Sequence, residues 1–201
     1  MSRSEPESLA VRKRRATNAR IAASAARLAG RHGVGGTTVD RIAADAEVGR
    51  ATFFRYYDTK ESAVAEGIAG PWLTLVTEAI ARQPGDRTAQ EALVAAFAEL
   101  AAEFPAQAGR IRELVRLTRS SPALDAWTAR AYQRYERAIA ELLAPRFEAP
   151  ASHDPRPRLL AALAMAAVRV SLDEWVRGGG ELPELPELLG RALNAVSVDG
   201  G

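Results

Sequence analysis

The chain of 201 residues carries a net charge of +2, with 47% hydrophobic and 26% charged residues, which fits one large or two small globular domains. It contains no cysteine and two histidines, which excludes disulfides, thiolate nucleophiles, cysteine-ligated zinc and a histidine-built metal centre. Residues 1–60 hold twelve Lys/Arg and six Asp/Glu (+6), whereas residues 61–201 hold fifteen and nineteen (−4), so the front of the chain is suited to a polyanion.

Residues 1–14 form the first segment, a basic arm that we expect to be flexible. Such arms can enter a DNA minor groove, and a solvated tail is an equal alternative. The arm lacks the apolar run and cleavage pattern of a secretory signal, and we find no run of about 18 apolar residues in the chain. We therefore expect a cytoplasmic protein with no membrane contact and no cofactor.

The rest of the chain carries helical signals, because Ala, Leu, Glu and Arg dominate and alternation with a period of two residues is absent. Proline and glycine punctuate the helices. A kink or break is expected at Gly70–Pro71, since proline removes a backbone donor. The pattern predicts an all-α fold of about nine helices, over residues 11–30, 38–45, 50–56, 59–70, 88–104, 109–119, 122–144, 159–177 and 183–196.

Capping signals locate a helix-turn-helix unit in the basic part of the chain. Thr37 and Asp40 have the spacing of a capping box, as do Asp58 and Glu61. Two short helices joined by about four residues and followed by a longer helix are typical of this motif. The sequence thus predicts a three-helix DNA-binding domain over residues 15–68 and a helical-bundle domain over residues 69–201.

The segment RATFFRYYDTK, residues 50–60, crowds four aromatic side chains beside cations. On a helix, Phe53 can point inward while Arg50 and Thr52 point outward, where they can reach base edges in the major groove. Tyr56 and Lys60 are suited to phosphate oxygens. The alternative is an ordinary helix end with rings in the core, but the position after a capped helix and a turn favours DNA binding.

The segment TTVDRIAADAEVGRATFFRYYDTKESAV resembles the DNA-binding signature of the TetR family of bacterial transcriptional regulators. The resemblance implies a homodimer that pairs through its last two helices and a C-terminal domain that binds a small ligand. Three positions depart from the pattern: Glu47 replaces the turn glycine, Gly49 replaces a capping Ser or Thr, and Phe54 replaces a tyrosine. The DNA-binding set comprises Thr37, Thr38, Gly49, Arg50, Ala51, Thr52, Arg55, Tyr56 and Lys60.

The C-terminal segments RIRELVRLTRSSPALDAW and SLDEWVRGGGELPEL are similar to a TetR subgroup that accommodates acyl-CoA-like ligands. Large apolar residues between helices could line the ligand site, although an ordinary core is the favoured alternative for each. Arginines on one helix face could meet an anionic head group, or form a solvated face. The candidate set is Trp72, Phe97, Phe104, Leu114, Arg116, Trp127, Met165 and Trp175.

The last two helices carry apolar stripes wide enough to predict a dimer surface, unless both helices merely cap the core. The predicted residues are Leu160, Leu163, Ala164, Ala167, Leu185, Leu188, Leu189, Ala192 and Leu193.

Together these features predict a repressor released from a palindromic double-stranded operator by a small molecule, with the helix at Gly70–Pro71 as lever. The alternative is an all-helical dimeric interaction module without sequence-specific DNA binding. An enzyme is not expected, because no phosphate loop or catalytic cluster is present.

Overall fold

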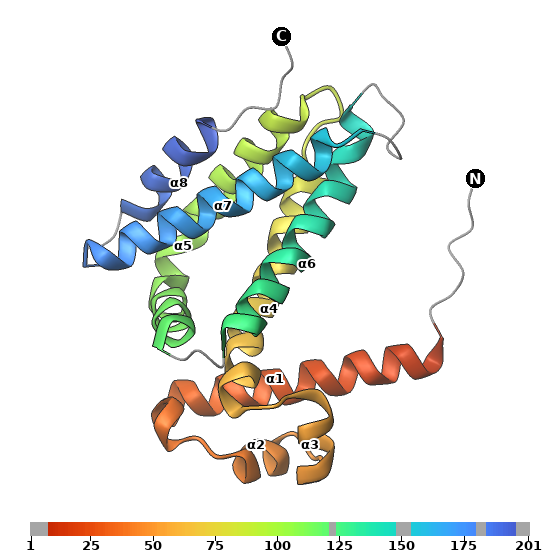
Figure 1. The fold of residues 1–201 in the computed structure, drawn as a ribbon, viewed down its shortest axis with the longest axis vertical. Helices are drawn as coiled ribbons and strands as arrows, with labels where there is room; N and C mark the ends of the chain where they lie inside the picture. The colour runs from red at the N-terminus through yellow and green to blue at the C-terminus, as the bar shows by residue number, and fades with distance from the viewer. Residues whose placement is uncertain (1–7, 121–123, 148–153, 180–183, 196–201) are drawn as a thin grey trace. The chain divides into compact units, whose positions relative to one another are not determined.

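A computed structural model describes residues 8–120, 124–147, 154–179 and 184–195, and every regular element in these ranges is helical (Figure 1). The all-α prediction is therefore confirmed. The chain divides between Gly70 and Pro71 into two compact units. Among the described helices, none combines the length and the apolar character needed to cross a bilayer. The α-helices are α1 (Leu9–Gly36), α2 (Val39–Asp45), α3 (Arg50–Tyr56), α4 (Lys60–Ala81), α5 (Ala89–Ser120), α6 (Asp125–Leu143), α7 (Arg156–Arg177) and α8 (Glu184–Asn194).

Helix α1 begins inside the segment that was predicted to be a flexible arm. Ser8 caps it by accepting a hydrogen bond from the amide of Val11 at 3.4 Å. Residues 9–14 are thus helical, because Leu, Ala, Arg and Lys are good helix formers, while residues 1–7 lie outside the described residues. The first buried side chain of α1 is Ile21. Near its other end Gly33 takes φ +70°, which kinks the helix before the turn to α2.

The helix-turn-helix elements lie within one residue of their predicted positions, and α3 matches its prediction. The capping residue of α2 differs from the prediction: Thr38, not Thr37, accepts from the amide of Arg41 at 3.3 Å. Thr37 is instead fully buried, and its hydroxyl donates to the carbonyl of Gly33 at 2.9 Å. Gly49 precedes α3 without a side-chain cap.

Helix α4 runs through Gly70–Pro71, so the predicted break was wrong. Pro71 cannot donate to the carbonyl of Gly67, which removes one bond of the ladder. Buried side chains on both sides of it, including Val64, Val76 and Ile80, keep the helix in place. The predicted Asp58 cap was also wrong, since Thr59 accepts from the amide of Ser62 at 3.1 Å.

Helix α5 likewise continues through Pro105 and joins two predicted helices into one of 32 residues. In the C-terminal unit, α6 packs against α7, and α7 packs against α8 (Figure 1). A larger core cluster includes Leu93, Ile139 and Leu160, and a smaller cluster surrounds Trp175. Buried aliphatic side chains at helical spacing form both clusters, so apolar packing stabilises this unit.

A set of polar contacts joins the turn after α6 to the connection between α4 and α5. The short 3-10 turn η2 (Ala144–Arg146) presents the guanidinium of Arg146 to three backbone carbonyls of the α4–α5 connection. These are the carbonyls of Gln83, Pro84 and Arg87, at 2.9, 2.6 and 3.1 Å. A planar cation with several donors is well suited to such a cluster of acceptors.

Candidate nucleic-acid interface

Helix α3 presents one face to its own unit and the other to solvent. Phe53 is fully buried, together with Ile42 of α2, as the sequence predicted. Phe53 packs edge-on against Phe54 and tilted against Tyr57, with ring centroids 5.4 and 5.9 Å apart. This aromatic group fixes the rotation of a helix that is too short to be stable alone.

The outward face of α3 carries the side chains that were predicted to contact DNA. Arg50, Ala51 and Arg55 are exposed, and Thr52 and Tyr56 are half-buried. The guanidinium of Arg55 lies 5.8 Å from the ring centroid of Tyr56. A helix face with cationic, hydroxyl-bearing and small side chains can contact phosphates and base edges of a major groove.

Arg50 makes two contacts that the sequence did not predict. Its Nη1 donates to Asp40 Oδ1 at 2.6 Å, and its guanidinium carbon lies 5.4 Å from the ring centroid of Phe54. Asp40 had entered the prediction only as a capping partner of Thr37. No spacing rule pairs these residues, since Asp40 lies on α2 and Arg50 lies on α3.

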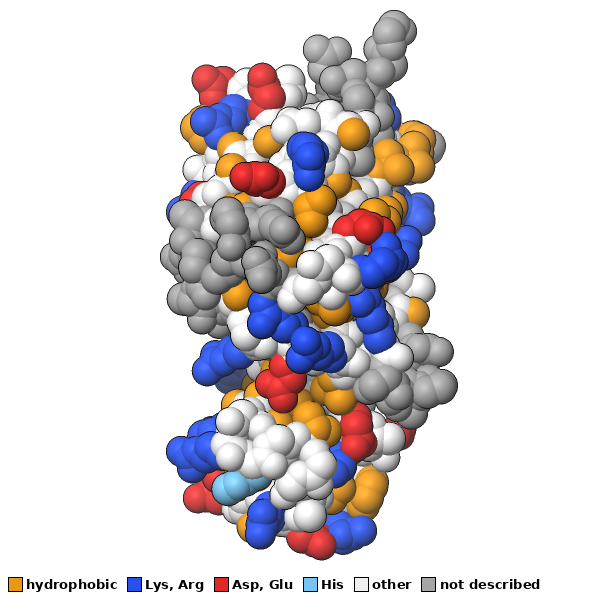
Figure 2. Space-filling view, turned by 90° about the vertical axis from the view of Figure 1, so that its left-hand side faces the viewer, with side chains coloured by type: hydrophobic (Ala, Val, Ile, Leu, Met, Phe, Trp, Pro, Cys, Tyr) orange, Lys and Arg blue, Asp and Glu red, His pale blue; other side chains and the backbone are white. Residues whose placement is uncertain are grey.

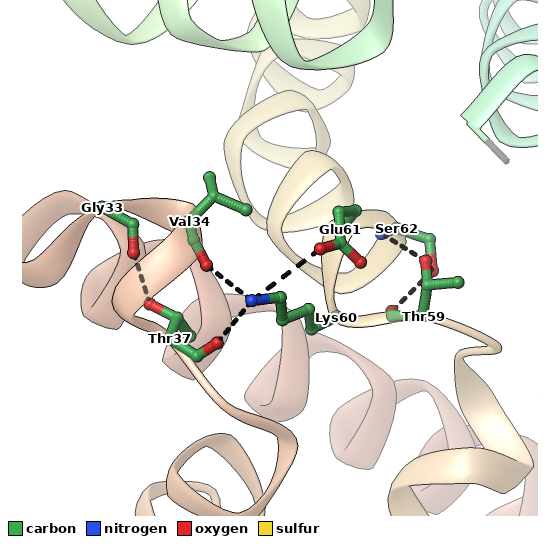
Figure 3. A network of polar contacts seen from close by, with 7 residues as sticks. All are labelled: Gly33, Val34, Thr37, Thr59, Lys60, Glu61 and Ser62. Atoms are coloured by element: carbon green, nitrogen blue, oxygen red, sulfur yellow. Dashed lines mark hydrogen bonds and ion pairs between the residues drawn. The ribbon is translucent and has the colours of Figure 1, made fainter. Parts of the chain in front are cut away.

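Lys60, which was predicted to contact a phosphate, lies against acceptors of its own unit. Its ammonium donates to the carbonyls of Val34 and Thr37, each at 2.8 Å, and lies 3.9 Å from Glu61 Oε1 (Figure 3). It therefore connects the start of α4 to the end of α1 and to the turn before α2. The sequence did not predict these acceptors, because they lie more than twenty residues away along the chain.

Two arginines of α1 hold α2 in place. Arg20 Nε donates to the carbonyl of Ala46 at 2.8 Å, and Arg27 forms an ion pair with Asp45. A hydrogen bond from Ser24, assisted by the charges of Arg27 and Arg31, holds the pKa of Asp45 below its usual value. These contacts orient the two short helices relative to α1, and sequence reasoning missed them because they are long-range.

The turn between α2 and α3 is strained at the position where the sequence departs from its family pattern. Glu47 has φ +52°, the left-handed region that ordinary side chains avoid. A separate close approach in this unit joins α4 to α1, where a Cβ on Gly67 would lie 2.0 Å from the carbonyl oxygen of Ala22. Gly67 thus lets α4 contact the backbone of α1 directly.

The surface of this unit is basic. Residues 8–70 contain eleven Lys/Arg and six Asp/Glu, a balance of +5. Figure 2 shows several basic side chains, with a few acidic ones among them, at its lower end. The face is therefore suited to a polyanion.

The structure divides the predicted ligand residues between two clusters of the C-terminal unit. Met165 and Phe97 belong to the larger cluster, and Trp72 and Trp175 belong to the smaller. Trp127 is buried, Leu114 is half-buried and Arg116 is exposed, while the side chain of Phe104 lies outside the described residues. The guanidinium of Arg112 lies 5.2 Å from the ring centroid of Trp175.

Most of the predicted dimer residues face the core of their own unit. Leu160, Ala164, Ala167, Leu185 and Leu193 are buried, and Leu188, Leu189 and Ala192 are half-buried. Of the predicted α7 stripe only Leu163 is exposed. The exposed apolar side chains of α7 are Leu159, Leu163 and Val170, at 50%, 40% and 47% exposure. The predicted residues and the exposed ones therefore overlap at Leu163, because both faces of the helix carry apolar side chains.

Comparison with known proteins identifies both units. Residues 21–66 match the family described as "Bacterial regulatory proteins, tetR family", and residues 87–198 match the family described as "MftR C-terminal domain". The chain is 28% identical to the HTH-type transcriptional regulator TcmR of Streptomyces glaucescens over 80% of this chain and 74% of TcmR. It is 27% identical to MftR of Mycobacterium tuberculosis, whose name assigns it to mycofactocin biosynthesis, over 96% of this chain and 95% of that protein.

Among solved structures, the fold is similar to that of Thermus thermophilus FadR, a TetR-family repressor crystallised with lauroyl-CoA. The TM-score is 0.60 at 23% identity, over 92% of this chain and 99% of FadR. The similarity of fold agrees with the sequence matches, which together cover both units. The chain therefore belongs to the TetR family of bacterial regulatory proteins.

Proposed function

We propose that the protein is a DNA-binding repressor whose α3 reads the major groove of an operator. The observation that carries this proposal is the pattern of exposure on α3. Phe53 is buried, whereas Arg50 is exposed and Thr52 and Tyr56 are half-buried, so these three side chains are accessible to DNA. Arg can pair with guanine through two donors, and Thr can donate a hydroxyl or contact a thymine methyl. Gly49 and Ala51 are small enough to let the helix approach the groove closely.

The contacts of Thr37 and Lys60 change the proposed phosphate set. Both side chains have partners inside the unit, so they position α2 and α4. Thr38, Arg55 and Tyr56 remain the proposed phosphate contacts. The start of α1 adds the consecutive cations Arg12, Lys13, Arg14 and Arg15, which makes this helix a second candidate for contact with the DNA backbone.

We further propose that two copies pair through the exposed stripe of α7 formed by Leu159, Leu163 and Val170. A symmetric operator would then mirror the two-fold symmetry of the protein. Leu163→Glu should produce monomers in sedimentation at micromolar concentration, whereas Leu9→Glu, at a more exposed leucine of α1, should leave the dimer intact. A dimeric Leu163→Glu variant would assign the interface to another surface.

The proposed ligand combines an apolar chain with an anionic head, as in an acyl-CoA. Apolar clusters beside cations support this choice: Arg112 covers Trp175, and Arg119 pairs with Asp173 next to the half-buried Tyr132. FadR was crystallised with such a molecule. Ligand binding would favour a dimer geometry that no longer fits two successive major grooves, with α4 as the helix shared by both units.

Calorimetric titration with lauroyl-CoA, with coenzyme A and laurate as controls, tests the ligand. Heat of binding together with release of DNA is the expected result. An absence of both would remove the acyl-CoA proposal.

The DNA-binding proposal is tested by selection of duplexes from a random library by the intact protein. A palindromic consensus is expected, and Arg50→Ala/Thr52→Ala should lose discrimination between that consensus and a scrambled duplex. Unchanged discrimination would contradict the role of α3. Enrichment of no sequence would favour the interaction module without DNA specificity.

A further inference from the structure

Asp40 and Arg50 form a contact between α2 and the first turn of α3. Asp40 Oδ1 accepts from Arg50 Nη1 at 2.6 Å, while Phe54, one turn further along α3, lies under the guanidinium with 5.4 Å between carbon and ring centroid. A carboxylate and a ring on different elements therefore restrain the same side chain. The direction of the Arg50 guanidinium is fixed by both.

The pair contributes little to the stability of the unit. The two side chains are 60% and 72% exposed, and solvent screens ion pairs in this setting so that they stabilise a fold little. Other contacts hold α2 to the unit, including Arg20 with Ala46 and Arg27 with Asp45. Asp40 in the first turn of α2 also favours that helix through its dipole, but this effect needs no arginine partner.

Asp40 is an unfavourable residue for binding a polyanion in general, because its carboxylate repels phosphates. The same carboxylate occupies one nitrogen of Arg50 and leaves the other donors of the planar group to point in a set direction. Recognition of guanine needs two parallel donors at N7 and O6, whereas a phosphate oxygen accepts an arginine in many orientations. A restrained arginine is thus better suited to a base than to the backbone.

We propose that Asp40 is a positioning residue for base recognition, which holds Arg50 toward a guanine and away from phosphate oxygens. The inference rests on the proposed DNA-reading role of α3. Its consequence is that Asp40 lowers affinity for DNA in general and raises discrimination between sequences.

The test compares Asp40→Asn with Asp58→Asn, which removes another exposed carboxylate of the same unit, in the segment that follows α3. The probes are the consensus duplex selected by the wild-type protein and a scrambled duplex of the same composition. Asp40→Asn should lower the ratio of the two affinities about tenfold, the value of one lost bidentate contact. Asp58→Asn should leave the ratio unchanged, and Asp40→Glu, which keeps the charge and can reach Arg50, should retain most of it.

The same substitutions on an Arg50→Ala background separate positioning from a structural effect. On that background, Asp40→Asn should not lower the ratio of the affinities for the consensus and scrambled duplexes any further, because the partner of Asp40 is absent. A ratio unaltered by Asp40→Asn, or lowered equally with and without Arg50, would overturn the proposal. A wild-type protein that selects no sequence would instead overturn the DNA-reading function itself.

Discussion

The two units of the chain are stabilised in different ways. In the N-terminal unit, two helices of seven residues each bury Ile42 and Phe53, and side chains that reach backbone carbonyls, as Arg20 and Lys60 do, add to their placement. In the C-terminal unit, helices of 11 to 32 residues pack apolar faces together, and Trp175 and Leu160 are fully buried.

The difference follows from helix length. A helix of two turns has too few backbone bonds to be stable by itself, so its position depends on specific contacts. Directed hydrogen bonds fix position and angle, as contact with base edges requires. Apolar packing is less directional, which suits a unit that is proposed to adopt two arrangements.

The largest expected effect concerns the close contact between α1 and α4. Gly67→Ala places a methyl group 2.0 Å from the carbonyl oxygen of Ala22, so backbone must move, at a cost of about 3 kcal/mol or more. Gly70→Ala is the matched control, because the nearest atom to its new Cβ is a side-chain oxygen at 3.9 Å. Denaturant unfolding should show a large loss for the first variant and a gain of about 0.5–1 kcal/mol for the second. Equal effects would show that the approach of the helices does not matter.

Lys60→Met tests the polar contacts of the N-terminal unit. It leaves two carbonyl groups without their cationic donor, and the free energy of unfolding should fall by about 2–3 kcal/mol. Lys13→Met, on the exposed start of α1, should leave stability unaltered but reduce the salt dependence of DNA binding. The reverse result, a smaller salt slope for Lys60→Met at full stability, would restore the phosphate role predicted from sequence.

Tyr132 provides a test of burial in the C-terminal unit. Burial, aided by the charge of Asp173, raises the pKa of Tyr132 from 10.0 to about 12. The folded state holds this proton more tightly than the unfolded state, so the stabilisation is complete below pH 10 and is lost as pH rises to about 12. Relative to Tyr132→Phe, the wild-type protein should lose about 2 kcal/mol over this range. Parallel stability curves for the two proteins would contradict the burial.

The smallest expected effect concerns the turn between α2 and α3. Glu47→Gly relieves a φ of +52° and should stabilise the N-terminal unit by about 1 kcal/mol. It also removes a negative charge beside α3, so affinity for scrambled DNA should rise. Glu47→Asn should give a smaller gain, since Asn tolerates this conformation better than Glu. A loss of stability in both variants would mean that the Glu47 side chain itself supports the turn.

The sequence predicted the N-terminal unit more accurately than the C-terminal unit, for physical reasons. Local signals define short elements, so α3 and the burial of Phe53 were predicted correctly. The acceptors of Lys60 and the pairing of Asp40 with Arg50 depend on tertiary contacts, which local spacing does not reveal.

In the C-terminal unit, Pro71 and Pro105 did not end their helices, because packing of the flanking residues outweighs one lost hydrogen bond. Of the α7 residues predicted for the dimer surface, Leu160, Ala164 and Ala167 are buried within their own unit, since Ala and Leu occupy both faces of the helix. Leu160 and Leu163 are three residues apart, yet one is fully buried and the other is 40% exposed.

The central claim is that Arg50 of α3 contacts base edges in the major groove. The direct measurement is chemical methylation of guanine N7 in the selected duplex, with and without the protein. Wild-type protein should protect the N7 of one guanine in each half-site. Arg50→Ala should restore the reactivity of that N7, while protection of the DNA backbone, measured separately, persists. Protection that is identical for both proteins would contradict the claim.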